Sequence, residues 1–146
     1  MKKVLFIDRD GTLIKEHPPT YQIDSFAKLT FYPHVFKYMT KIAEELDYEL
    51  VLVSNQDGMG TEKFPAEQFR SVHNLIMTSF ANEGVVFANE LIDVSYPEDN
   101  LPSRKPGIGM FTGYLNNPGY DSAISFLIGD RLTDVQLAAY LGCKAI

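Results

Sequence analysis

Residues 4–12 read Val4-Leu5-Phe6-Ile7-Asp8-Arg9-Asp10-Gly11-Thr12, an apolar run that ends in two aspartates and a glycine. An apolar run rich in β-branched and aromatic residues predicts a buried strand of a parallel sheet. Asp8 and Asp10 are two residues apart, so their carboxylates can face the same way at the end of that strand, where open α/β sheets bind ligands. Two carboxylates this close repel each other unless a cation or a shared proton offsets their charge. The plain alternative is a solvated acidic turn, because Asp-Gly is also a common turn sequence.

The composition is that of a globular protein and argues against several other classes. The chain has 146 residues, of which 45% are hydrophobic, and this fits one domain with a sizeable core. Its net charge of −6 argues against broad binding to nucleic acid or to an anionic membrane. No apolar run approaches the roughly 20 residues of a membrane span, and Met1-Lys2-Lys3 leads directly into a strand. Cys143 is the single cysteine, so no intrachain disulfide is expected and a cytoplasmic location is the default prediction.

Strand-like and helix-like segments alternate along the chain. Strands are expected at Val4–Asp8, Leu50–Ser54, Leu91–Ser95 and Ser125–Asp130, with Lys144–Ile146 as a short fifth. Helices are expected after Pro33, from Pro65 towards Gly84, around Ile108–Leu115 and from Thr133 to Leu141. This alternation predicts an α/β three-layer sandwich with a central parallel sheet between helices. Right-handed crossovers would then place all the carboxyl ends of the strands at one edge.

Polar residues gather where these strands end. They are Asp8 and Asp10 after the first strand, Ser54 and Asn55 after the second, and Asp130 and Asp134 after the fourth. Arg104 and Lys105 follow the third strand at a distance that allows the chain to fold back to the same edge. Three strand ends with polar side chains in an apolar setting favour a ligand site over a solvated turn.

These side chains match the needs of phosphate-monoester hydrolysis. Asp8 could attack phosphorus to give an aspartyl-phosphate, while Asp10 protonates the leaving alkoxide and later deprotonates the attacking water. Mg²⁺ prefers oxygen ligands, which Asp8, the backbone carbonyl of Asp10, and Asp130 would supply. Ser54 and Lys105 would bind the phosphoryl oxygens.

Several of these residues also have ordinary structural explanations. Ser54-Asn55 could cap a turn, and Arg104-Lys105-Pro106 could be an exposed loop. Asp134 follows Asp130 by one helical turn, so it is expected to stabilise the helix N-terminus or support the metal ligands from behind. His73 lies within a helical pattern and is expected to be a surface or hydrogen-bonded group instead of a ligand.

Taken in order, these motifs resemble those of the haloacid dehalogenase superfamily of aspartyl-phosphate phosphatases. Asp8–Thr12 resembles the first motif, Ser54 the second, Lys105 the third and Gly129–Asp134 the fourth. The presence of Arg9, together with Arg104-Lys105-Pro106, narrows the resemblance to the group that contains histidinol-phosphate and heptose-bisphosphate phosphatases. Together with the charges of the flanking loops, the resemblance predicts that substrate or phosphate is bound by Arg9, Ser54, Asn55, Arg104, Lys105, Glu16 and Asp57.

Within this group, two loops resemble those of one kind of domain more than the other. Glu16–Asp24 and Ser54–Thr61 are similar to the loops after the first and second motifs in the histidinol-phosphatase domains of bifunctional histidine-biosynthesis proteins. This resemblance implies hydrolysis of L-histidinol phosphate, a small-molecule monoester, without nucleic acid or membrane as a partner. It also implies that an imidazoleglycerol-phosphate dehydratase domain follows in the native protein. Two alternatives stay open: a heptose-bisphosphate phosphatase, and a catalytically silent module that binds a phosphorylated ligand.

Many of these relatives bind zinc through a loop just before the third motif, with Cys, His, Cys and Cys as ligands. Those positions here hold Asp93, Ser95, Leu101 and Ser103. Leucine cannot bind a metal, and one carboxylate with two hydroxyls makes a poor zinc site, so no structural zinc is expected. Tyr96-Pro97 packing and the rigid Pro102 are expected to order the loop instead.

No insertion in the chain is large enough for a separate cap domain. Residues 1–146 are therefore expected to form a single phosphatase domain, with residues 15–30 as a flap-like loop over the site. Glu16 and Asp57 lie in the loops that flank the site and could pair with the amine of histidinol phosphate. A second phosphate would instead need more basic groups than Lys15 and Lys63, the lysines of these loops.

Overall fold

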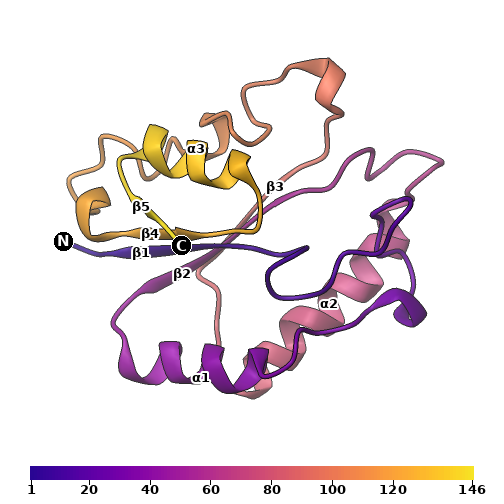
Figure 1. Ribbon diagram of the computed structural model, residues 1–146, viewed down its shortest axis with the longest axis horizontal. Coiled ribbons are helices and arrows are strands. Elements are labelled where there is room, and N and C mark those ends of the chain that lie inside the picture. Colours follow the sequence, from indigo (N-terminus) through magenta and orange to yellow (C-terminus); the bar gives the residue numbers. More distant parts are fainter.

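The computed structural model describes all of residues 1–146 and contains a parallel sheet with helices on both faces (Figure 1). The strands are β1 (Val4–Asp8), β2 (Glu49–Asn55), β3 (Asn89–Asp93), β4 (Phe126–Ile128) and β5 (Lys144–Ala145), in the spatial order β3-β2-β1-β4-β5. The α-helices are α1 (Val35–Glu45), α2 (Ala66–Asn82) and α3 (Leu132–Leu141). Short 3-10 helices are η1 (Phe26–Lys28), η2 (Pro97–Asp99), η3 (Gly109–Phe111) and η4 (Ser122–Ile124). The predicted three-layer α/β fold without a cap domain is confirmed.

The central strand β1 has a core on each side, as its uniform hydrophobicity predicted. Leu5 and Ile7 point to one core, which α1 and α2 cover, and Val4 and Phe6 point to the other, which α3 covers (Figure 1). All five residues of β1 are buried. Because β1 is paired with β2 on one side and β4 on the other, its carboxyl end lies in the middle of the sheet edge.

The main departure from the predicted elements lies between β3 and β4. The helix expected around Ile108–Leu115 is only the three-residue η3, followed by turns. Gly109 and Gly113 weaken helix formation there, and Phe111 is buried edge-on against Phe6 with ring centroids 5.3 Å apart. The segment therefore forms only short turns, such as the one closed by the Leu115 amide donating to the Phe111 carbonyl over 3.0 Å, and these turns pack around the Phe111 ring.

Residues 15–30 leave the body of the fold and return to it at nearly the same point. The amide of Lys15 donates to the carbonyl of Thr30 over 2.8 Å, and Ile14 forms an antiparallel bridge with Phe31. The neck of this loop is anchored by Leu13 and Ile14, which are fully buried. None of the helices is both long and apolar enough to span a membrane.

Candidate active site

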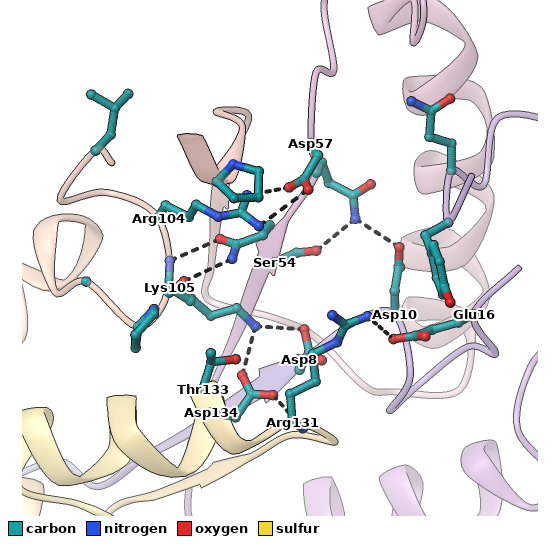
Figure 2. Close-up of a pocket in the computed structure, with 18 of the residues that line it drawn as sticks. Asp8, Asp10, Glu16, Ser54, Asp57, Arg104, Lys105, Arg131, Thr133 and Asp134 are labelled. Carbon is teal, nitrogen blue, oxygen red and sulfur yellow. Dashed lines mark hydrogen bonds and ion pairs between the residues drawn. The ribbon is translucent and has the colours of Figure 1, made fainter. Parts of the chain in front are cut away.

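A cavity of about 830 Å³ lies at the carboxyl edge of the sheet (Figure 2). Its floor is formed by Asp8 at the end of β1, Asp10 just after it, Ser54 near the end of β2, and Lys105 from the loop that follows β3. The N-terminal end of α3 and the loop 15–30 complete its walls. The sheet topology thus brings together polar residues that are far apart in the sequence, as the predicted parallel order requires.

Lys105 is the central cation of the cavity floor. Its Nζ donates to Asp8 Oδ1 over 2.9 Å and to Asp134 Oδ1 over 3.0 Å (Figure 2). Burial raises the pKa of Asp8 to about 8, although Lys105 opposes this shift. Burial by itself would lower the pKa of Lys105, but the two carboxylates outweigh that effect and raise it. Lys105 therefore remains charged between two acidic groups that need a cation.

Three carboxylates converge beside this lysine in a way that fits a hard cation. Asp8, Asp130 and Asp134 each offer one oxygen, and these oxygens all lie within 4.8 Å of one another. Gly11 leaves room for the cluster, because a Cβ there would lie 2.2 Å from Asp130 Oδ2. Gly11 also has a φ of +90°, which favours glycine. An all-oxygen donor set of this kind suits Mg²⁺.

Asp134 is less free to act as a metal ligand than Asp130. One oxygen of Asp134 accepts from Lys105, and the other accepts from the backbone N–H of Arg131 over 3.2 Å, at the start of α3. Asp130 is exposed on the turn after β4. This arrangement is consistent with the supporting position that the sequence predicted for Asp134.

The carboxylate of Asp10 is held on both oxygens. Arg9 Nε donates to Oδ1 over 2.6 Å, and Gln56 Nε2 donates to Oδ2 over 3.2 Å and to Ser54 Oγ over 2.8 Å. Arg9 is fully buried and does not line the cavity. The structure therefore places Arg9 behind Asp10 and not in the position for phosphate binding that the resemblance implied.

Asn55 holds the backbone of Lys105 in place. Its side chain accepts from the amide of Lys105 over 3.1 Å and donates to the carbonyl of the same residue over 3.3 Å. Ser54 is buried beside Gln56 at the cavity floor. Of the two polar residues at the end of β2, Ser54 thus has its hydroxyl in the Asp10 network, while Asn55 links β2 to the loop that carries Lys105.

Two arginine–carboxylate pairs lie at the rim of the cavity (Figure 2). Arg131 Nη2 donates to Glu16 Oε1 over 2.8 Å, which links α3 to the loop 15–30. Arg104 donates from both Nη1 and Nη2 to the two oxygens of Asp57. Glu16 and Asp57 were both expected to face the substrate, and both line the cavity, but each already neutralises an arginine.

A cluster of hydrogen bonds occupies the loop positions where relatives bind zinc. The buried Asp93 accepts from the Ser95 amide over 3.1 Å, from Ser95 Oγ over 2.5 Å and from Ser103 Oγ over 2.5 Å. Tyr96 packs closely against the loop after β2, because a Cβ added to Gly58 would lie only 2.1 Å from the Tyr96 hydroxyl. Leu101 is half-exposed and lines the cavity. The loop before Lys105 is thus closed by protein groups.

Comparison with known proteins decides the family. A model of the polynucleotide kinase 3 phosphatase family matches residues 3–134. The chain belongs to this family. It is a haloacid dehalogenase-like phosphatase, a hydrolase of phosphoric monoesters, as the motifs predicted.

The chain is also similar to proteins of histidine biosynthesis. The histidine biosynthesis bifunctional protein HisB of Bacteroides fragilis is 56% identical over 145 residues, which cover 99% of this chain and 39% of that protein. HisB of Spirosoma linguale is 56% identical over 146 residues, which cover 100% of this chain and 38% of that protein. The chain therefore spans less than half the length of these curated relatives.

Among solved structures, the fold is similar to D,D-heptose 1.7-bisphosphate phosphatase from B. bronchiseptica, crystallised with magnesium and phosphate. The TM-score is 0.84 and the sequence identity is 25%, with 98% of this chain and 78% of that chain covered.

Proposed function

We propose that the chain hydrolyses L-histidinol phosphate to L-histidinol and phosphate through an aspartyl-phosphate on Asp8. The geometry that carries this proposal is the pair Asp8 and Lys105 on the floor of the cavity, with Asp10 two residues away and held on both oxygens. The 56% identity with HisB across nearly the whole chain supports histidinol phosphate as the substrate. As the phosphatase part of a longer protein, the chain would precede a dehydratase domain, and a cytoplasmic location fits such a role.

The proposed reaction has two steps on the same residues. An oxygen of Asp8 attacks phosphorus, the bond to the leaving alkoxide breaks, and Asp10 gives that oxygen its proton. Asp10 then takes a proton from water, which attacks phosphorus and releases Asp8 and phosphate. Lys105 holds Asp8 in place over 2.9 Å and offers its charge to the phosphoryl oxygens. The loop 15–30 would act as a flap that limits access of water.

Asp8, Asp130 and the backbone carbonyl of Asp10 would hold Mg²⁺, with Asp134 behind them. When bound, this cation would neutralise charge on the phosphoryl oxygens and offset the repulsion among the carboxylates. No structural zinc is proposed, because the Asp93 cluster already closes the loop. Elemental analysis of the purified protein should therefore find far less than one zinc per chain after dialysis, and a retained stoichiometric zinc would contradict this.

The charge of the cavity lining favours an amino-alcohol phosphate over a sugar bisphosphate. Five carboxylates line the cavity (Asp8, Asp10, Glu16, Asp57 and Asp134), against the three cations Arg104, Lys105 and Arg131. The two arginines are paired with Asp57 and Glu16, so no cation of the lining is left for a second phosphate. A cationic amine on the substrate could instead pair with Glu16 or Asp57 at the rim by sharing the carboxylate with its arginine.

A heptose bisphosphate is the second candidate, supported by the structural similarity to the B. bronchiseptica enzyme. The deciding experiment measures phosphate release from histidinol phosphate, heptose bisphosphate and p-nitrophenyl phosphate with Mg²⁺ present. Histidinol phosphate should have the highest kcat/KM of the three, and Asp8→Asn should lower every rate by about four orders of magnitude or more. A higher kcat/KM for the bisphosphate would overturn the substrate assignment. Near-normal turnover by Asp8→Asn would exclude the nucleophile, and tight phosphate binding without turnover would favour a silent module.

A further inference from the structure

A chain of polar contacts runs from the surface of β3 to the carboxylate of Asp10. Glu90 on β3 is bonded to His73 Nε2, and His73 Nδ1 lies 3.0 Å from Arg9 Nη1. Arg9 Nε in turn donates to Asp10 Oδ1 over 2.6 Å. The side chain of Glu90 is 41% exposed, whereas those of His73 and Arg9 are 8% and 0% exposed. Of these four residues, only Glu90 at one end is exposed at the surface and only Asp10 at the other end lines the cavity.

The chemistry of these groups fixes the direction of each hydrogen bond. A guanidinium group can only donate, so His73 Nδ1 must accept from Arg9. The ring proton then lies on Nε2 and is donated to Glu90. Phe69 stacks on the His73 ring and also lies under the guanidinium of Arg9, with its centroid 4.9 Å from each group. His73 and Arg9 are thus held in one orientation by packing as well as by hydrogen bonds.

As a consequence, the two carboxylate oxygens of Asp10 differ in their hydrogen-bond donors. Oδ1 accepts the short bond from Arg9, while Oδ2 accepts the longer bond from Gln56. A proton placed on Oδ1 would compete with a cationic donor at 2.6 Å, so Oδ2 is the oxygen that can carry it. When Asp10 gives up this proton, its new negative charge lies beside the buried guanidinium, which stabilises it.

We propose that His73, acting through Arg9, is a positioning residue that sets the orientation in which Asp10 delivers its proton to the leaving group. This inference rests on the proposed phosphatase mechanism. In that step the bond between Asp8 and phosphorus forms, the bond between phosphorus and the leaving oxygen breaks, and the Oδ2 proton moves to that oxygen. Asp10 is left as a carboxylate paired with Arg9.

The contribution of a proton donor depends on the leaving group, and this separates positioning from a merely structural role. The alkoxide of histidinol phosphate needs a proton as it leaves, whereas p-nitrophenolate leaves without one. The ratio kcat/KM reports the steps up to departure of the leaving group, so it excludes the later hydrolysis of the aspartyl-phosphate. A variant that misplaces Asp10 should therefore lose kcat/KM for the alkyl ester selectively.

The test compares His73→Leu with His73→Asn in the full chain with Mg²⁺. Leucine fills the space but leaves Arg9 Nη1 without its acceptor, while the side-chain oxygen of asparagine can take the place of Nδ1. His73→Leu should lower kcat/KM for histidinol phosphate by about tenfold or more and that for p-nitrophenyl phosphate by less than about threefold. His73→Asn should recover most of the loss. Val72→Ala, which truncates the buried neighbour on α2, should leave the ratio between the substrates unchanged.

Equal losses for both substrates in His73→Leu, or a His73→Asn variant as impaired as His73→Leu, would overturn the positioning role. If His73→Leu does not fold, Glu90→Ala decides by the same comparison, because it removes the acceptor that orients the ring. A selective loss for the alkyl ester is then expected, and an equal loss for both would overturn the proposal. Wild-type protein that releases phosphate from neither substrate would instead overturn the proposed function itself.

Discussion

Lys105 and Arg9 are both buried cations beside one of the two aspartates after β1, but they face opposite sides of the site. Lys105 lines the cavity and contacts Asp8 and Asp134, whereas Arg9 lies behind the cavity and contacts Asp10 and His73. Lysine provides a compact point charge for groups that change partners, and arginine provides a rigid fork that fixes two partners at once. In the proposed mechanism, Lys105 would therefore serve the phosphoryl group and Arg9 would serve proton transfer.

Of the substitutions that test this division between Lys105 and Arg9, replacing Lys105 by methionine should lower activity the most. Asp8 and Asp134 would lose their shared cation, so kcat/KM should fall by about a thousandfold for histidinol phosphate and p-nitrophenyl phosphate alike. Breaking this buried pair should also destabilise the metal-free protein by about 3–5 kcal/mol. Thermal unfolding with and without Mg²⁺, together with both rates, checks this.

Lys63→Met, at an exposed position of the loop after β2, is the matched control and should behave as wild type. A Lys105→Met variant whose loss is confined to the alkyl ester would contradict the division of roles, because it would place Lys105 in proton transfer.

The sequence predicted the Lys105 side of the site much better than the Arg9 side. Asp8 and Ser54 lie at the carboxyl ends of strands of a parallel sheet and Asp130 lies just after one, and strand order alone brings such ends together. The contact between Arg9 and His73 joins residues 64 positions apart through a helix–strand packing that no local pattern encodes. One signal was present: His73 lies among the core positions Phe69, Val72 and Ile76 of α2, where a polar side chain requires a partner.

The sequence also predicted the positions of the charged residues at the rim of the cavity better than it predicted their partners. The positions of Glu16 and Asp57 beside the site followed from the strands that precede them, but their arginine partners depend on how four separate connecting segments pack. Gln56 also follows the predicted strand Leu50–Ser54 closely, but its bond to Asp10 depends on the path of the chain after β2. Periodicity predicts which face a residue occupies, and it does not predict which long side chains meet across a cavity.

Removing the exposed carboxylate of Asp130 should raise the Mg²⁺ concentration needed for activity more than removing the buried carboxylate of Asp134. Asp130→Ala should raise the Mg²⁺ concentration for half-maximal activity by about ten- to a hundredfold. Asp134→Ala should raise it less, because Asp134 is already bonded to Lys105 and to the start of α3. Activity titrations with Mg²⁺ measure both values. Activity of the wild type that persists after exhaustive chelation would contradict a metal role altogether.

Neutralising Glu16 or Asp57 at the rim should alter the preference among substrates, by a smaller factor than the substitutions of Lys105 and Asp130. Glu16→Gln or Asp57→Asn should raise KM for histidinol phosphate by about tenfold and leave p-nitrophenyl phosphate nearly unchanged. Each change also releases an arginine, Arg131 or Arg104, so turnover of the heptose bisphosphate should improve. Glu62→Gln, exposed on the loop after β2 and outside the cavity lining, is the control. Equal effects on all substrates would show that these carboxylates do not contact the amine.

The two sides of the site should also respond to pH in opposite directions, measured as the free energy of unfolding without metal. On the Lys105 side, the folded-state pKa of Asp8 is about 8 against an ordinary value of 3.8. The folded protein therefore holds this proton more tightly than the unfolded chain does between those values. Stability from this group is present below pH 3.8 and is lost as the pH rises through 8. Asp8→Asn should flatten that loss.

On the Arg9 side, the pKa of His73 is shifted in the other direction, and its contribution to the pH dependence of the unfolding free energy should be the smallest effect of all. Burial lowers the pKa of His73 below its ordinary 6.5, although Glu90 opposes the shift, and Arg9 on the other side of the ring adds to it. Above pH 6.5 neither state takes up the proton, but below it the unfolded chain binds more protons than the folded protein, so stability falls as the pH falls. Denaturant unfolding of His73→Asn should therefore show a weaker acid-side decline than wild type, whereas His34→Asn, an exposed histidine before α1, should not. An acid-side decline as steep in His73→Asn as in wild type would mean that protonation of His73 does not oppose folding, and that Nδ1 is not committed to Arg9.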